Sequence, residues 1–393
     1  MKPLEGIRVL DLSRMVAGGV AGMLLADFGA DVVKVEQPGT GDPLRQWTTD
    51  GQPMWWKVYG RNKRYITLNL KDSQGRALLQ RLLPRFDVAI ESFVPGTLES
   101  MELGWNVLSG WNPRLILARI SGWGQTGPSS RRPGFGTLIE AASGFAAMNG
   151  EPDGSPIVPS FPMADMTSAL YTVNAIMFAL YHRDVNGGTG QVIDVALFES
   201  LFSVLGPLAA EYAASGRVRE RNGSRSKNAG PRGCFRTSDG RFIAVSGSTP
   251  KMAERFLVSY GLGDLLADER FATNEARVRN GLELDAAIAG AIASRTLDEN
   301  LEIINGNALT AVAVQTVVDI ERDPHWQFRQ LLRDVPTAKG TVRMHNVVPR
   351  LSGTPGDISW AGGALGEHNR DIYGTELGLQ RDDIVALEAA GVI

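Results

Sequence analysis

The chain has 393 residues, of which 43% are hydrophobic and 21% are charged, and its net charge is -3. This length is enough for two domains with sizeable cores, and the slightly acidic balance argues against the basic surface of a nucleic-acid-binding protein. The single cysteine, Cys234, excludes an internal disulfide and predicts a reducing, cytoplasmic location. No segment has the apolar length of a membrane span, and the four scattered histidines show no metal-ligand spacing, so neither a membrane nor a metal is expected.

The first half of the chain alternates strand and helix patterns. Helices are predicted at 17–30 and 72–86, the second with Asp72 as its N-cap. Short apolar strands are predicted at 7–13, 31–38, 65–70, 87–93, 115–124 and 191–198. Such alternation is typical of a doubly wound, Rossmann-like parallel α/β sheet.

The pattern changes after about Gly206, where the chain becomes polar, basic and rich in glycine. A strand pair around Asp239-Gly240 follows, and then mostly helical sequence to about residue 320. We therefore predict a large α/β domain, a linker, a small α+β domain, a second linker and a return to the large domain, at 1–205, 206–227, 228–322, 323–339 and 340–393.

The turn after the first strand has part of a dinucleotide-binding pattern. Ala17, Gly19 and Gly22 have the required spacing, and Glu36 ends the next strand. Because alanine replaces the first glycine, the pattern disfavours a nicotinamide or flavin site. A phosphate or adenine group near this turn stays open, since helix N-terminal amides attract phosphate in general.

Asp165 lies where a proline-containing loop meets a long apolar helix. The helix shows apolar residues at helical spacing, dense enough for burial on more than one side: Met166, Leu170, Val173, Ile176, Met177 and Leu180. Asp165 could be an N-cap, or it could be a carboxylate kept ionised by helix amides that lower its pKa and used as a nucleophile. Spacing alone leaves both interpretations open.

Several collinear blocks resemble the class III coenzyme A transferases, the family of formyl-CoA and carnitine CoA-transferases. The resemblance covers nearly the whole chain. The blocks are GIRVLDLSRMVAGG, LLADFGADVVKVEQP with GDPLR, NKRYITLNLKDSQGRALL, ESFVPGTLE, NPRLILARISGWGQTGP, RPGFGTLIEAASG, the segment around Asp165, YHRDVNGGTGQVIDVALFES and LGEHNRDIYGTELGL.

The resemblance implies that Asp165 is the catalytic nucleophile and that CoA passes from an acyl-CoA to a carboxylic acid through covalent aspartyl intermediates. Such a reaction requires no ATP, metal or redox cofactor, and CoA takes part as a substrate. The resemblance also implies an interlocked homodimer. Family members with the GFGTLIEA variant suggest succinyl-CoA as the donor and a small or branched dicarboxylate as the acceptor.

Three other functions can be weighed against transfer. An acyl-CoA racemase of the same family carries a histidine where this chain has Phe135 and Gly136, and it needs a second acid or base. Glu140 is nearby but is interpreted as a solvated helix residue without a catalytic role. The defective glycine pattern argues against a nicotinamide oxidoreductase, and a non-catalytic CoA-binding protein would not depend on Asp165.

The resemblance also implies residues that contact CoA: Val16, Ala17, Gln37, Leu68, Lys71, Ser92, Phe93, Met101 and Arg132. Gln37 and Ser100 stand where some members have arginines that reach the phosphates. The missing charges are assigned to other bases, with Arg45, Arg61, Lys63 and Arg132 as candidates, each of which has a surface base as the alternative. The loop 228–233, NAGPRG, matches a segment near the active site in the family.

Overall fold

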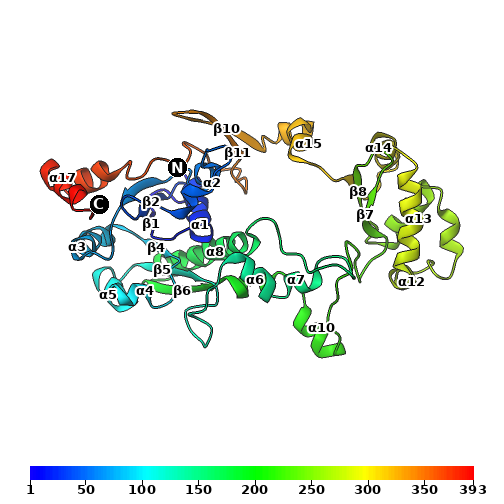
Figure 1. Ribbon diagram of the computed structural model, residues 1–393, viewed down its shortest axis with the longest axis horizontal. Coiled ribbons are helices and arrows are strands. Elements are labelled where there is room, and N and C mark those ends of the chain that lie inside the picture. Colours follow the sequence, from blue (N-terminus) through cyan, green and yellow to red (C-terminus); the bar gives the residue numbers. More distant parts are fainter. The chain divides into compact units, whose positions relative to one another are not determined.

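The computed structural model describes all 393 residues, which separate into two compact units. The first unit consists of residues 1–145, 158–208 and 328–393, and the second of 146–157 and 209–327. Chain order therefore places the second unit as an insertion in the first (Figure 1). The finer division into domains and linkers stays a prediction.

The first unit contains a six-stranded parallel sheet in the order β3-β2-β1-β4-β5-β6. Each predicted strand is confirmed, at β1 Arg8–Asp11, β2 Asp31–Glu36, β3 Arg64–Thr67, β4 Val88–Glu91, β5 Ile116–Ser121 and β6 Gln191–Ala196. The order reverses between β1 and β4, and such a switch point is where parallel α/β sheets bind ligands, at the carboxyl ends of their strands.

Helices cover both faces of this sheet because neighbouring strand residues point in opposite directions. Val9 of β1 joins a core with α1 Ala17–Asp27, α6 Gly136–Ala142, α8 Met163–Val185 and α9 Leu197–Ser203. Leu10 joins the opposite core with α3 Ser73–Leu82, α5 Trp105–Trp111 and α17 Arg381–Ala389. The Asp72 carboxylate accepts the Gln74 amide at 2.7 Å, which confirms the predicted cap of α3.

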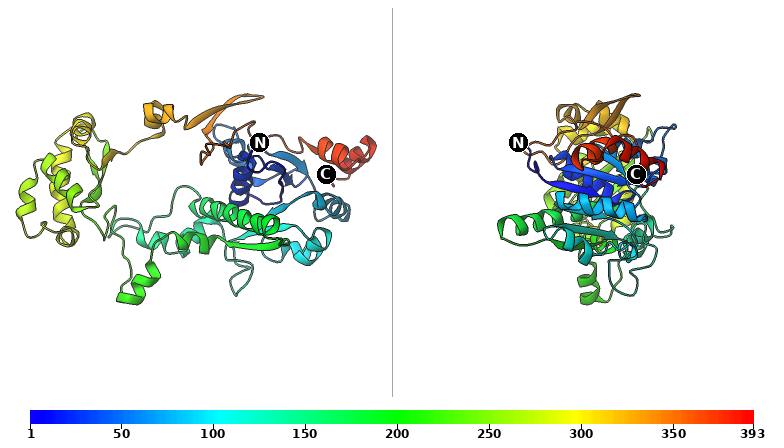
Figure 2. Two further views of the ribbon diagram at one scale, coloured as in Figure 1. Left: turned by 180° about the vertical axis from the view of Figure 1, so that it is seen from behind. Right: turned by 90° about the vertical axis from the view of Figure 1, so that its left-hand side faces the viewer.

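The rest of the first unit consists of short helices and one hairpin. The helices are α2 Met54–Tyr59, α4 Thr97–Ser100 and a π-helical turn at Arg370–Glu376, and the hairpin pairs β10 Leu332–Thr337 with β11 Gly340–His345. The helix α8, long and green in Figure 2, packs against α1. None of the chain's helices combines the length and the apolar character needed to cross a membrane.

The two edges of the sheet differ. The edge strand β3 is sealed by a later segment, because His368 Nδ1 accepts the Tyr65 amide at 3.0 Å and Asn369 Oδ1 accepts the Thr67 amide at 2.9 Å. The opposite edge strand, β6, has no further strand paired to it, and Val192 on it is 37% exposed. An uncovered edge strand of this kind can pair with or pack against another surface.

The second unit has its own antiparallel sheet and core. The strands β7 Arg232–Arg236 and β8 Phe242–Ser246 form the predicted hairpin around Asp239-Gly240, and β9 Ala311–Ala313 pairs with β8. Its helices are α7 Phe145–Met148, α10 Leu208–Ser215, α11 Pro250–Ser259, α12 Asn274–Arg279, α13 Gly281–Ala293, α14 Leu297–Gly306, α15 Val317–Arg322 and α16 Pro324–Phe328, of which α7, α10 and α16 overlap its boundaries.

Candidate active site

A cleft of about 360 Å³ opens at the carboxyl ends of β1 to β4. Its walls come from the turns that follow these strands, where parallel α/β sheets bind ligands. The lining residues are Leu12, Ser13, Arg14, Val35, Glu36, Gln37, Thr40, Gly41, Asp42, Leu68, Leu70, Lys71, Phe93, Thr97 and Met101. The cleft is therefore mainly apolar with several polar groups, as a site for a nucleotide-like molecule requires.

Five of the predicted CoA-contacting residues line this one cleft: Gln37, Leu68, Lys71, Phe93 and Met101. Four others do not line it. Val16 and Ala17 are buried at the start of α1, and the Ser92 hydroxyl is bonded to the backbone of Arg14 next to the cleft. Arg132 is exposed, with its guanidinium 5.1 Å from the ring centre of Trp123.

Three of the bases proposed for the CoA phosphates are already paired inside the protein. Arg45 donates two hydrogen bonds of 2.7 Å to Glu36. Glu36, the acid of the partial dinucleotide-binding pattern, is therefore paired as well. Arg61 and Lys63 are 1% and 2% exposed, so they are neither phosphate ligands in the cleft nor surface bases. Sequence reasoning failed here because buried lysines and arginines are rare unless they are paired.

The basic side chains of the cleft are instead Arg14 and Lys71, both exposed to solvent. Arg131 lies close to the cleft. A Cβ built on Gly96, the neighbour of the cleft residue Thr97, would stand 3.5 Å from the Arg131 guanidinium. Sequence reasoning missed Arg14, although it directly follows the strand predicted at 7–13, the place where a parallel sheet presents ligand-binding side chains.

Asp165 is the third residue of α8, which begins at Met163 after Pro162. The interpretation of Asp165 as the N-cap is therefore wrong. Its carboxylate lies near the backbone amide of Ala17, the first residue of α1, and that amide acts to lower the pKa of Asp165. The two helix N-termini thus meet at this carboxylate, and both favour a negative charge there.

Glu140 takes the place expected for a cap. Its Oε1 accepts the amide of Ala164, in the first turn of α8, at 3.1 Å. The side chain is 1% exposed, so the expectation that Glu140 is a solvated helix residue is wrong. Burial here is possible because the carboxylate satisfies an amide that would otherwise lack a partner.

The pKa of Asp165 is raised to about 6, chiefly by burial and then by the nearby Glu140 charge, and the amide of Ala17 only partly opposes the rise. The direction is opposite to the predicted one, in which helix amides lowered the pKa. At neutral pH the carboxylate is still mostly ionised. A carboxylate with a pKa near 6 is also more basic, and so a stronger nucleophile, than an ordinary aspartate.

Gly136 makes room for this carboxylate. A Cβ built on Gly136 would overlap Asp165 Oδ2 and would lie 3.8 Å from Glu140 Oε1. The two carboxylates therefore face the same small space at the start of α6. Because no side chain fits at 136, the position that the racemase comparison singled out accommodates the Asp165 carboxylate instead.

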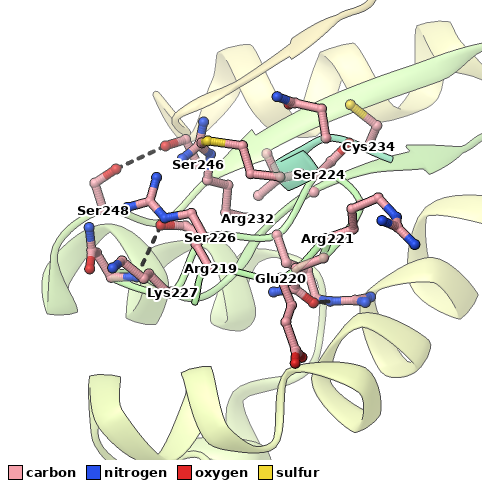
Figure 3. Close-up of a pocket in the computed structure, with 18 of the residues that line it drawn as sticks. Arg219, Glu220, Arg221, Ser224, Ser226, Lys227, Arg232, Cys234, Ser246 and Ser248 are labelled. Atoms are coloured by element: carbon pink, nitrogen blue, oxygen red, sulfur yellow. Dashed lines mark hydrogen bonds between the residues drawn. The ribbon is translucent and has the colours of Figure 1, made fainter. Parts of the chain in front are cut away.

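A second hollow, of about 1710 Å³, lies wholly within the second unit (Figure 3). Three of its six basic residues are ion-paired, since Arg219 and Lys227 both contact Glu211 and Arg225 contacts Asp285. The hydrogen bond from Lys227 lowers the pKa of Glu211, an acid of this hollow. We therefore place the candidate active site in the first unit, although this hollow is larger.

The loop 228–233 is tied to α12 and the residues before it. The Asn228 carbonyl accepts the Asn274 side-chain amide at 3.0 Å, and the Gly230 carbonyl accepts Arg277 Nε at 2.9 Å. Arg277 is 3% exposed and also bonds the Phe271 carbonyl. These bonds hold the base of the loop in one conformation.

Comparisons with known proteins agree with the geometry of the first unit. The family model described as CoA-transferase family III matches residues 4–369. The chain is similar to the succinyl-CoA–D-citramalate CoA-transferase of Chloroflexus aurantiacus, with 39% identity over 100% of this chain and 98% of the relative. It is 36% identical to the succinate–glutarate CoA-transferase of Agrobacterium fabrum, over 94% of each chain.

Solved structures give the same result. The crystal structure of a CAIB/BAIF family protein from Brucella suis superimposes with a TM-score of 0.85 and 33% sequence identity, covering 95% of this chain and 99% of that one. A Mycobacterium tuberculosis protein superimposes with a TM-score of 0.83 and 31% identity, covering 94% and 98%. The chain belongs to the class III coenzyme A transferases and is a CoA-transferase.

Proposed function

We propose that the protein transfers CoA from succinyl-CoA to a small or branched dicarboxylic acid, with Asp165 as the nucleophile. The observation that carries the mechanism is the placement of the Asp165 carboxylate, which is half-buried in the first turn of α8 and occupies the space that Gly136 leaves open. The dicarboxylate preference rests on the relatives, which are named as transferases for citramalate and glutarate.

The first half of the reaction consumes the donor. An Asp165 carboxylate oxygen attacks the thioester carbonyl, and the carbon–sulfur bond breaks. The CoA thiolate departs, and a mixed anhydride of Asp165 with the donor acyl group remains. The thiolate then attacks the Asp165 carbonyl, which releases the free donor acid and leaves CoA as a thioester on Asp165.

The second half runs in reverse on the acceptor. Its carboxylate attacks the aspartyl thioester, which forms a second anhydride and frees the thiolate again. The thiolate attacks the acceptor's carbonyl, and the new acyl-CoA leaves with Asp165 restored. Because the thioester energy is kept in covalent bonds, the scheme consumes no ATP.

CoA is assigned to the cleft of the first unit. The apolar residues Leu68, Phe93 and Met101 suit the adenine ring, and Lys71 with Arg14 suits the phosphates. Val16 and Ala17 are proposed to contact the part of CoA that extends from this cleft to Asp165. Gln37 keeps a polar contact, and Ser92 and Arg132 remain candidates at the margin.

We also infer a homodimer. The helix α8 exposes a row of apolar side chains on its outer side: Leu170 at 57%, Tyr171 at 41%, Phe178 at 74%, Tyr181 at 61% and Val185 at 63%. The expected burial of α8 on more than one side is therefore incomplete in the single chain. A row of this size is typical of an interface, and sedimentation at low concentration should give a dimer without monomer. Interlocking of the two chains and a cytoplasmic location stay predictions.

Trapping of the intermediate tests the mechanism. With succinyl-CoA and no acceptor, intact-protein mass spectrometry should show a CoA adduct that maps to the peptide with Asp165. Hydroxylamine should convert it to a hydroxamate, and an acceptor acid should remove it. A racemase would instead exchange solvent deuterium into the α-carbon without an adduct. A panel of donors and free acids that never labels this peptide would refute the nucleophile.

A further inference from the structure

Four charged side chains are buried together beneath the turn that joins β1 to α1. Asp11, Lys34, Lys63 and Asp42 are each at most 3% exposed. They alternate in sign, with Lys63 Nζ 2.9 Å from Asp11 Oδ2, Lys34 Nζ 3.5 Å from Asp11 Oδ1, and Lys34 Nζ 3.2 Å from Asp42 Oδ2. We call this set the buried tetrad.

The buried tetrad holds the backbone of the turn at three points. Asp11 accepts the Ser13 amide at 3.0 Å, and Lys34 donates to the Ser13 carbonyl. Asp42 accepts the Met15 amide at 3.1 Å, and Lys63 donates to the Gly19 carbonyl at 2.7 Å. Met15 has a φ of 63°, a conformation that costs a non-glycine residue energy unless its surroundings hold it.

The segment fixed in this way connects the two parts of the candidate site. On one side, Ser13 and Arg14 line the CoA cleft. On the other, Ala17 begins α1, which packs against α8, and its backbone amide acts on the Asp165 carboxylate. A shift of the turn would therefore move the cleft wall and the hydrogen-bond donor of the nucleophile together.

We propose that the buried tetrad positions the groups that take part in the reaction. Asp11 and Lys63 are positioning residues, which hold Ala17 against Asp165 and keep the cleft wall at a fixed distance from Asp165. This inference rests on the proposed role of Asp165. Geometry, rather than stability, explains the four charges best, because well-packed apolar residues stabilise a core at least as well as buried ion pairs do.

The decisive variant neutralises one pair without leaving a lone charge. In Asp11→Asn/Lys63→Met, Lys34 keeps Asp42 as its partner at 3.2 Å. We expect kcat to fall about 10-fold or more and KM for the acyl-CoA to rise, because small misplacements of reacting groups are costly in rate. The acid limb of the kcat/KM–pH profile should also move to higher pH by about one unit, since a displaced Ala17 amide no longer favours the ionised form of Asp165.

This pH readout depends on what faces Asp165. The charged group beside it is Glu140 of α6, and α1 presents only the backbone amide of Ala17. The double variant leaves Glu140 unchanged. A move of the acid limb to higher pH would therefore report displacement of the Ala17 amide from Asp165.

The chain offers a matched control in Asp27→Asn/Arg61→Met. Arg61 Nη2 lies 2.7 Å from Asp27 Oδ2, and both side chains are as buried as those of the tetrad. Their other bonds go to His345 and Asn62, not to the turn. This variant should lower the unfolding temperature while kcat stays within about 2-fold and the acid limb does not move.

A gentler variant covers the case in which the double variant fails to fold. A Cβ on Gly22 would stand 3.0 Å from Asp11 Oδ2 and 3.2 Å from Lys63 Nζ, so Gly22→Ala presses on the pair while it favours the helix. We expect a smaller shift in the same direction. Loss of kcat with an unmoved acid limb in both variants, or no change in either variant, would overturn the positioning role. Failure to trap wild-type Asp165 would instead refute the proposed nucleophile.

Discussion

Asp11 and Asp165 both contact α1, yet their surroundings act on them in opposite directions. Burial would raise the pKa of Asp11, but Lys34 and Lys63 more than offset it, and its pKa lies below the ordinary value. Asp165 is also raised by burial, and its charged neighbour is Glu140, so its pKa rises to about 6. Burial is common to both sites, and the sign of the neighbouring charge decides whether the pKa of the carboxylate falls or rises.

The comparison between Asp11 and Asp165 is tested most severely by removing the carboxylate of Asp165. Asp165→Ala should lower the transfer rate by about 10³-fold or more, because no neighbour can form the covalent intermediate. Binding of CoA, measured by calorimetry, should change little, since the cleft residues are intact. Near-normal turnover in this variant is the outcome that contradicts the mechanism.

The next largest effect should come from crowding the carboxylate. In Gly136→Ala the new Cβ overlaps Asp165 Oδ2, so the carboxylate must move, and kcat should fall about 100-fold. The control is Gly110→Ala in α5, where an added Cβ meets no atom within 4 Å. Equal activity of the two variants would show that the space at 136 has no part in the reaction.

Removing the negative charge of Glu140, the like-charged neighbour of Asp165, should shift the pH profile of the reaction rather than abolish activity. In Glu140→Gln the like charge is lost, while the amide oxygen can still accept the Ala164 amide. The pKa of Asp165 should fall, so the acid limb of kcat/KM should move to lower pH by up to about one unit. Asp153→Asn, which removes an exposed acid of the second unit, serves as the control for a general charge effect. An acid limb that stays in place would mean that Glu140 does not act on the nucleophile.

The smallest effect concerns stability. The folded pKa of Asp165, about 6, exceeds the ordinary value of 3.8, so protonation favours the folded state and this contribution is lost as pH rises through 6. Asp165→Asn should therefore raise the free energy of unfolding by about 2 kcal/mol at pH 8, after allowance for partial exposure, and by about half as much at pH 5. Denaturant titrations at both pH values check this, and a gain that grows toward low pH would contradict the sign.

The contrast between Asp11 and Asp165 also shows which features of the fold and the site could be predicted from the sequence. The strands, the Asp72 cap and the position of Asp165 follow from local patterns, because periodicity and capping act over a few residues. The direction of the Asp165 pKa could not be predicted, since it depends on Glu140, which reaches it only through tertiary packing. Arg61 and Lys63 were mistaken for accessible bases for the same reason, because their partners Asp27 and Asp11 are distant in sequence.

The sealed edge of β3 has a consequence for how the protein is made. Tyr373 is fully buried, and its hydroxyl donates to the Thr67 carbonyl, 306 positions earlier. A ribosome therefore completes the whole inserted second unit before the segment that covers β3 emerges. Until then β3 presents unpaired amides next to a finished neighbour strand, a state prone to aggregation. Low temperature or added chaperone during expression should improve the yield of folded protein.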